Sequence, residues 1–153
     1  MDDPYKLERF VEAQEAIYYP PLTMYEDALR ELRAGRKRHH WMWYIFPQVA
    51  GLGHSVASQF FAIRSLGEAE AYLAHPLLGP RLEACALAAN SREGRSVSAI
   101  FGSPDDLKFG SSMTLFAQIT PVESVFHTAI RKFFDGRFDL GTLRELKLTK
   151  PAR

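Results

Sequence analysis

Hydrophobic residues recur every three or four positions along most of this chain. An α-helix has 3.6 residues per turn, so this spacing places them on one helical face. Such stripes occur in residues 7–14, 25–32, 66–73, 78–89 and 122–133. Thr23, Ser65 and Thr120 each stand three residues before a glutamate, which is the spacing of a capping box at a helix start. The pattern predicts a protein built from many short helices.

The aromatic segment of residues 40–46 fits no single period. It is apolar on nearly all sides, which suits either a strand or a buried helix. No second alternating run offers a pairing partner, so we favour the buried helix. Asp3-Pro4 is the expected start of the helix over residues 7–14, and further helices are expected after Ser55, Ser103-Pro104 and Asp139. The predicted fold is all-α, a compact single-domain bundle of about seven to eight short helices spanning residues 1–153. At least half of the residues are expected to be helical, with no sheet of three or more strands.

The inward faces of these helices define a predicted core. Hydrophobic residues make up 46% of the chain, and this composition is globular and not disordered. The residues expected to be buried in one cluster are Phe10, Leu29, Trp41, Ile45, Leu82, Phe116, Phe126 and Phe133.

The charge and the cysteine content bear on the compartment of the protein and on what it can bind. The net charge is +1, so any electrostatic recognition requires a local patch. The single cysteine, Cys85, cannot form an internal disulfide, which favours a reducing compartment. The N-terminal residues lack the pattern of a signal peptide, and the longest apolar run, residues 41–47, is far shorter than the ~20 residues that span a bilayer. We expect a cytoplasmic monomer that does not associate with membranes.

Several strings resemble blocks of one bacterial protein family, called domain of unknown function 1810 and sometimes labelled calpastatin. They are residues 7–14, 40–48, 51–53, 71–79, 100–102, 105–108 and 111–116, and together they cover nearly the whole chain. The resemblance implies an all-helical fold with no established activity. A more remote similarity, to YbiA-like proteins, implies a link to ADP-ribose chemistry. The calpastatin label has no physical support, because an unfolded inhibitor would lack capped, amphipathic helices.

The sequence departs from the family pattern at two places. His39 stands where a small hydroxyl residue is usual, and Phe109-Gly110 replaces a leucine and a basic residue. We expect the second change to loosen the backbone before Ser111.

Two of the family blocks place polar side chains directly beside bulky apolar ones. The polar or aromatic candidates are His40, Trp41, Trp43 and Gln48 in one block, and Asp106, Lys108, Ser111, Ser112 and Thr114 in the other. A buried polar group without a partner costs about 1–3 kcal/mol, so core packing alone does not explain the lysine and the hydroxyls. We therefore expect the two segments to meet at one concave surface. The structural alternative is that the tryptophans are core and that Ser111 or Ser112 caps a helix.

The leading functional hypothesis is a pocket for a phosphorylated nucleoside-like small molecule, such as an ADP-ribose derivative. Cations suit phosphate, and an aromatic face suits a base. The predicted ligand contacts are Trp41, Trp43, Gln48, Lys108, Ser111, Ser112 and Thr114. If the protein is an enzyme, which the sequence leaves open, His40 or Asp106 is the predicted acid or base.

Metal and cofactor sites are not expected. No ligand spacing typical of zinc or calcium occurs, and the adjacent His39 and His40 point in different directions on a helix or a strand. Cys85 lies in an alanine-rich stripe, where a thiol is buried and unreactive.

The alternative hypothesis is a module that binds nucleic acid or protein through a basic patch at residues 36–40. A protein with a purely structural role is the third. The small-molecule and basic-patch hypotheses differ in which side chains should lie together in the fold. An exposed face shared by Arg36, Lys37, Arg38, Arg92 and Arg95 would favour a polyanion, whereas Lys108 and Ser111 meeting His40 in a cleft would favour a small molecule.

Overall fold

Ten helices form the regular structure of residues 2–147, which are the residues that the computed structural model describes. They are α1 (Glu8–Glu15), α2 (Met24–Ala34), α3 (Met42–Ile45), α4 (Val56–Phe60), α5 (Leu66–Ala74), α6 (Leu78–Asn90), α7 (Val97–Phe101), α8 (Asp105–Ala117), α9 (Val125–Phe134) and α10 (Leu140–Glu145). Helix accounts for 58% of the structure, and residues 2–147 contain no sheet. The all-α prediction is confirmed, although the helices outnumber the seven to eight expected. Met1 and residues 148–153, part of the predicted domain, lie outside the described residues.

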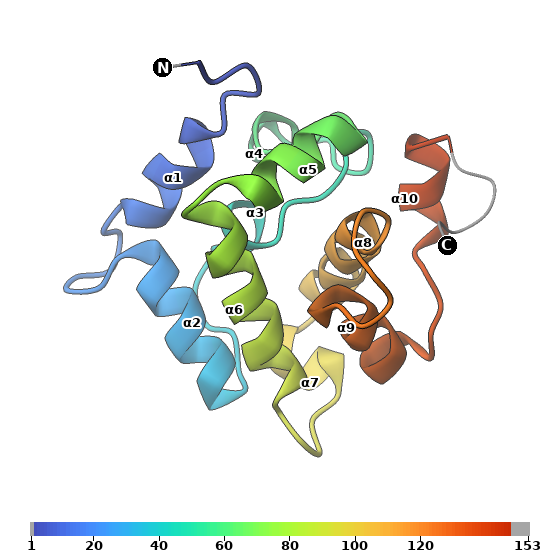
Figure 1. Cartoon of the computed structure of the whole chain (residues 1–153). Coiled ribbons are helices and arrows are strands. Elements are labelled where there is room, and N and C mark those ends of the chain that lie inside the picture. Colours follow the sequence, from blue (N-terminus) through green and yellow to red (C-terminus); the bar gives the residue numbers. More distant parts are fainter. Residues whose placement is uncertain (1, 148–153) are drawn as a thin grey trace.

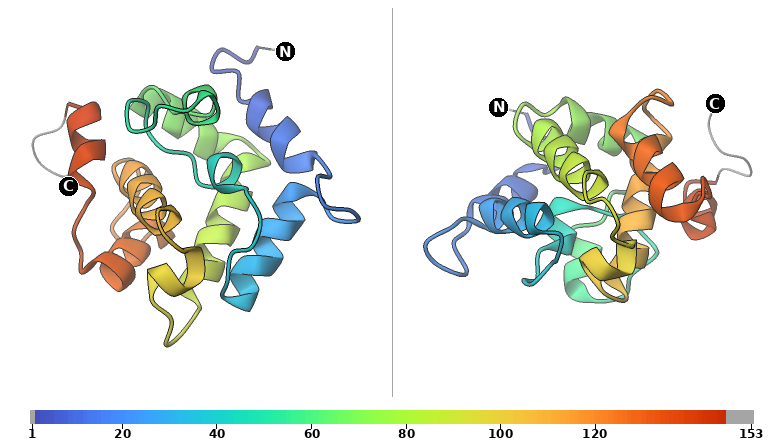
Figure 2. Two further views of the ribbon diagram at one scale, coloured as in Figure 1. Left: turned by 180° about the vertical axis from the view of Figure 1, so that it is seen from behind. Right: turned by 90° about the horizontal axis from the view of Figure 1, so that it is seen from below.

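Helix α6 runs through the middle of the molecule (Figure 1). It packs against α2 and α5 on one side and against α9 on the other, while α9 packs against α8. Helix α10 lies at the edge beside α8, and the views from behind and below show the same order (Figures 1 and 2). Among residues 2–147 the longest helices have 13 residues, and none is a candidate for crossing a bilayer.

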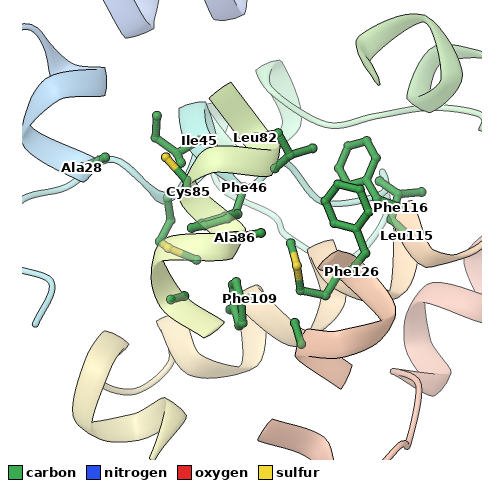
Figure 3. Close-up of a cluster of buried hydrophobic side chains, with 14 of the residues drawn as sticks. Ala28, Ile45, Phe46, Leu82, Cys85, Ala86, Phe109, Leu115, Phe116 and Phe126 are labelled. Atoms are coloured by element: carbon green, nitrogen blue, oxygen red, sulfur yellow. The ribbon is translucent and has the colours of Figure 1, made fainter. Parts of the chain in front are cut away.

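One continuous cluster of apolar side chains fills the space between these helices (Figure 3). Six of the eight predicted core residues are fully buried in it, and Leu29 and Phe133 are partly buried and pack against it. Phe109 is fully buried in it: its ring stacks on Phe101, with the centroids 4.5 Å apart, and meets Phe46 edge-on at 5.0 Å. The core prediction is therefore confirmed. Burial also raises the pKa of the Cys85 thiol to about 12, so this cysteine is not a nucleophile at neutral pH.

Six of the ten helices described above begin at a side-chain cap that is local in the sequence. Thr23 forms a complete capping box with Glu26, and Ser65 and Asp139 cap α5 and α10. The start predicted at Thr120 was wrong. The Thr120 hydroxyl donates to Phe116 O, and α9 begins four residues later, where Ser124 accepts from the backbone N–H of His127.

This later start changes which residues face inward. Val122, predicted to be buried, is 57% exposed. His127 is buried, and its Nε2 lies 2.8 Å from the carbonyl oxygen of Ala117.

Helix α8 is continuous through the Phe109-Gly110 departure, so the expected loosening was wrong. A Cβ at Gly110 would lie 2.9 Å from Phe134 Cζ, which shows that glycine allows the Phe134 ring to pack closely. Ser111 and Ser112 lie in the middle of α8 and cap no helix.

The buried carboxylate of Glu31 connects α2 to the aromatic segment. Its Oε1 accepts hydrogen bonds from Trp41 Nε1 at 2.9 Å, Arg38 N at 2.7 Å and His39 N at 2.9 Å. Burial on its own raises the pKa of Glu31, but these hydrogen bonds outweigh it and hold the pKa below its usual value. Glu31 thus remains ionised while it fixes the backbone ahead of α3.

Candidate functional site

A hollow of about 480 Å³ lies where the segment after α3 meets α8 and α10. Its walls come from three parts of the chain that are far apart in sequence. The lining residues are Trp43, Gln48, Leu52, Gly53, His54, Ser55, Ser58, Pro104, Leu107, Lys108, Ser111, Asp139, Gly141 and Arg144. The two family blocks therefore meet at a concave surface, through Trp43 and Gln48 on one side and Lys108 and Ser111 on the other.

Lys108 and Trp43 form the most distinctive contact in this hollow. The Lys108 Nζ lies 4.9 Å from the centroid of the Trp43 ring, which is within the range of a cation–π interaction. Lys108 also lies 3.6 Å from Asp105 Oδ1, one turn earlier in α8. The Trp43 Nε1 is buried and has no hydrogen-bond partner among the described residues. An ammonium group, an aromatic face and an unpaired N–H donor thus lie together.

The loop before α4 supplies another part of the wall. Ser55 caps α4 by accepting from Ser58 N at 3.1 Å, and the Ser58 hydroxyl donates back to Ser55 O. A Cβ at Gly53 would lie 2.5 Å from Ser58 Oγ, so only glycine allows the loop to lie this close to α4. His54, in the same loop, also lines the hollow.

Two of the predicted site residues in the aromatic block lie elsewhere. Trp41 is fully buried, and its indole N–H is used by Glu31, so it is a core residue and not a ligand-stacking one. His40 is exposed and does not line the hollow, which removes the geometric basis for its role as acid or base. The reason is the short helix α3: Trp41 turns inward ahead of it, and Trp43 turns towards α8.

Three of the predicted site residues in α8 lie outside the hollow. The Asp106 Oδ2 accepts from Ser98 Oγ at 2.7 Å, which joins α7 to α8 outside the hollow. Thr114 is buried, and its hydroxyl accepts from Asp139 N at 2.8 Å, which holds the chain before α10. Ser112 is buried, and its hydroxyl has no partner among the described residues. None of the three reaches the hollow.

The side chains of the basic stretch, residues 36–40, do not share one environment in the fold. The side chain of Lys37 is only 7% exposed, and its Nζ lies 2.8 Å from Asp105 Oδ2 and 5.1 Å from the centroid of the Trp41 ring. Arg36 and Arg38 are exposed. The side chains of Arg92 and Arg95 lie against Gly35, because a Cβ there would be 3.3 Å from Arg92 Cδ and 3.0 Å from Arg95 Nε.

Arg144 and Asp139 are lining residues that sequence reasoning missed. They come from the chain around α10, a short helix in which nothing but a capping aspartate stood out. A second hollow, of about 510 Å³, lies near the N-terminus, lined by Pro4, Tyr5, Lys6, Arg9, Phe60, Arg64, Ser65 and Glu68. It contains none of the predicted site residues.

Comparison with known proteins places this fold in a family. The chain resembles the crystal structure of the conserved hypothetical protein Rv1873 from Mycobacterium tuberculosis, with 48% sequence identity and a TM-score of 0.87, over 96% of this chain and 100% of that chain. No curated protein sequence matches it. Residues 4–146 match the family described as "Protein of unknown function (DUF1810)". The chain therefore belongs to the DUF1810 family.

Proposed function

We propose that the hollow between the loop before α4, α8 and α10 binds a phosphorylated nucleoside-like small molecule, for which an ADP-ribose derivative is a suitable test compound. The observation that carries the proposal is the Lys108 ammonium over the Trp43 ring at the wall of a hollow of about 480 Å³. Pockets of roughly 300–1,000 Å³ commonly hold small ligands.

The chemistry of the lining fits the two halves of such a ligand. Lys108 and Arg144 supply positive charge for a phosphate, and Trp43 supplies an aromatic surface for a base. Gln48 and Ser111 offer polar groups for a ribose. Ser111 already donates to Leu107 O at 3.2 Å, which leaves its oxygen able to accept a hydrogen bond.

Removal of the Lys108 charge provides the first test. Thermal-shift measurements against nucleotides, nucleotide sugars and ADP-ribose should identify a stabilising compound, since a ligand at 100 times its Kd adds about 2.7 kcal/mol. Lys108→Ala should then weaken binding of that compound by roughly 10- to 100-fold, because hydrogen bonds to charged groups contribute about 1.5–3 kcal/mol. The free energy of unfolding without ligand should change by less than about 1 kcal/mol, since the Asp105 pair is partly exposed. A large loss of stability would make Lys108 a structural residue.

Tryptophan fluorescence provides the second test. A ligand that stacks on Trp43 should change the emission of the wild-type protein on titration, whereas Trp43→Phe should show no such change, because Trp41 is buried elsewhere. An unchanged response in Trp43→Phe would place the ligand away from this hollow.

A second candidate function, polyanion binding, rests on the arginines that gather around Gly35. Arg36 and Arg95 are exposed there, and Arg92 donates to Arg33 O at 2.6 Å and so is held in place. Arg36→Ala separates the candidates. It should leave binding of the small molecule unchanged, but it would weaken a salt-dependent interaction with a single-stranded oligonucleotide.

A further inference from the structure

Three side chains capable of binding a metal ion converge on the side of the molecule away from the hollow. Asp27 and Glu31 lie one turn apart on α2, and His39 belongs to the segment that follows this helix. One ligand atom from each residue lies within 4.8 Å of the other two. Figure 1 shows α2 and α10 at opposite sides of the fold, and none of the three residues lines the hollow.

The carboxylate of Asp27 is the least satisfied group in this cluster. Asp27 is 1% exposed, and its Oδ2 is buried with no hydrogen-bond partner among the described residues. Its Oδ1 lies 3.5 Å from Arg30 Nη2, a long contact to a side chain that is 65% exposed. A buried carboxylate oxygen without a partner is costly, because it has lost its water and gained nothing in return. Its neighbours in the fold are another carboxylate and an imidazole, so a cation would satisfy it.

The contact between Glu31 Oε2 and His39 Nδ1 is the one that a metal ion would replace. Three N–H donors already occupy Glu31 Oε1, whereas Oε2 contacts only the Nδ1 of His39. The His39 ring is packed against Tyr19, with the ring centroids 4.0 Å apart, and this contact restrains its orientation. The side chain of His39 remains 29% exposed, so an ion could reach the site from solvent.

We propose that Asp27, Glu31 and His39 form a binding site for a divalent transition-metal ion, with Zn²⁺ as the preferred ion. The ion would lie between Glu31 Oε2 and His39 Nδ1 and would take one oxygen of Asp27 as its third ligand. Carboxylate oxygens and an imidazole nitrogen are all zinc ligands, and the nitrogen disfavours Mg²⁺ and Ca²⁺. Atoms about 2.0–2.2 Å from one ion stand roughly 3–3.5 Å apart, so binding requires side-chain shifts of about an ångström.

The sequence pattern does not predict this metal site. His39 and His40 are adjacent, and neither forms a recognisable ligand pair with a nearby residue. The contact partner of His39 is Glu31, eight positions earlier. Glu31 belongs to a helix whose sequence is typical of a charged surface helix. Only the turn after α2 brings the two together.

Metal titration of the whole protein tests this site. Isothermal titration with Zn²⁺ and visible absorption with Co²⁺ should both show one ion per chain, and Mg²⁺ should not compete. Asp27→Asn and His39→Ala should each weaken Zn²⁺ binding at least about tenfold, the range seen when even outer-shell partners of a metal are removed. His40→Ala, which removes the exposed neighbouring imidazole, is the matched control and should bind as the wild type does.

Two outcomes would overturn the proposal. One is that the wild-type protein binds neither Zn²⁺ nor Co²⁺ stoichiometrically. The other is that His40→Ala loses as much affinity as His39→Ala, which would indicate adventitious binding by surface histidines. Circular dichroism of each variant separates loss of the site from loss of the fold. Glu31 is left intact in this series because it also holds Trp41.

Discussion

Replacing Phe126 by alanine is expected to lower the free energy of unfolding by about 3–5 kcal/mol, the range for large aromatic residues removed from a packed core. Phe126 is 1% exposed, and its ring centroid lies 5.5 Å from that of Phe116 on the neighbouring helix α8. Its own helix, α9, packs against both α8 and α6, so the vacated volume would lie where three helices meet (Figure 3). Most domains have only about 5–15 kcal/mol of stability in total, so the variant should be marginal.

Urea or guanidinium unfolding monitored by circular dichroism measures this loss. Val122→Ala is the control, because Val122 precedes the same helix but is 57% exposed, and its loss should stay within about 0.5 kcal/mol. A loss below about 1 kcal/mol for Phe126→Ala would show that this face of α9 is not packed in the core.

Replacing Glu31 by alanine is expected to have an effect of similar size, about 3–5 kcal/mol, as found when one partner of a buried polar or ionic network is removed. The fully buried indole N–H of Trp41 would lose its acceptor, and the backbone N–H groups of Arg38 and His39 would lose theirs. Each such orphaned donor costs about 1–3 kcal/mol when water cannot reach it.

Chemical unfolding in the presence of a chelator measures this contribution without any bound metal. Glu83→Ala, at an exposed position of α6, makes the same change in a helix and should cost little. Equal losses for Glu31→Ala and Glu83→Ala would contradict the bridging role of Glu31. Trp41 emission should also shift to longer wavelength in Glu31→Ala if the indole gains access to water.

Helix starts show how far local sequence determines this fold. Thr23 and Asp139 cap the expected helices, because a cap bond joins residues only two or three positions apart. Thr120 and Ser124 are both competent caps, and the sequence pattern favours the wrong one. The tertiary structure selects Ser124, since the later start directs His127 towards the end of α8.

In the candidate site, too, the sequence indicates some features and the tertiary structure decides the others. The two polar and aromatic blocks were recognisable in the sequence, and Trp43, Gln48, Lys108 and Ser111 do line one hollow. Which tryptophan faces the hollow depended on Glu31, whose carboxylate holds Trp41 in the core from a helix ten residues away. A glutamate on an amphipathic helix gives no sign of such a role, because long charged side chains are usually solvated.

The sequence by itself determined the helical class, the positions of most helices and the residues of the core. These depend on periodicity and caps, which act over one or two turns. Only the tertiary structure decided that Asp106 and Thr114 join helices, that Arg144 and His54 reach the hollow, and that Asp27, Glu31 and His39 meet. Such groupings depend on how whole helices pack, and packing is set by the fit of many side chains at once rather than by the pattern of any one segment.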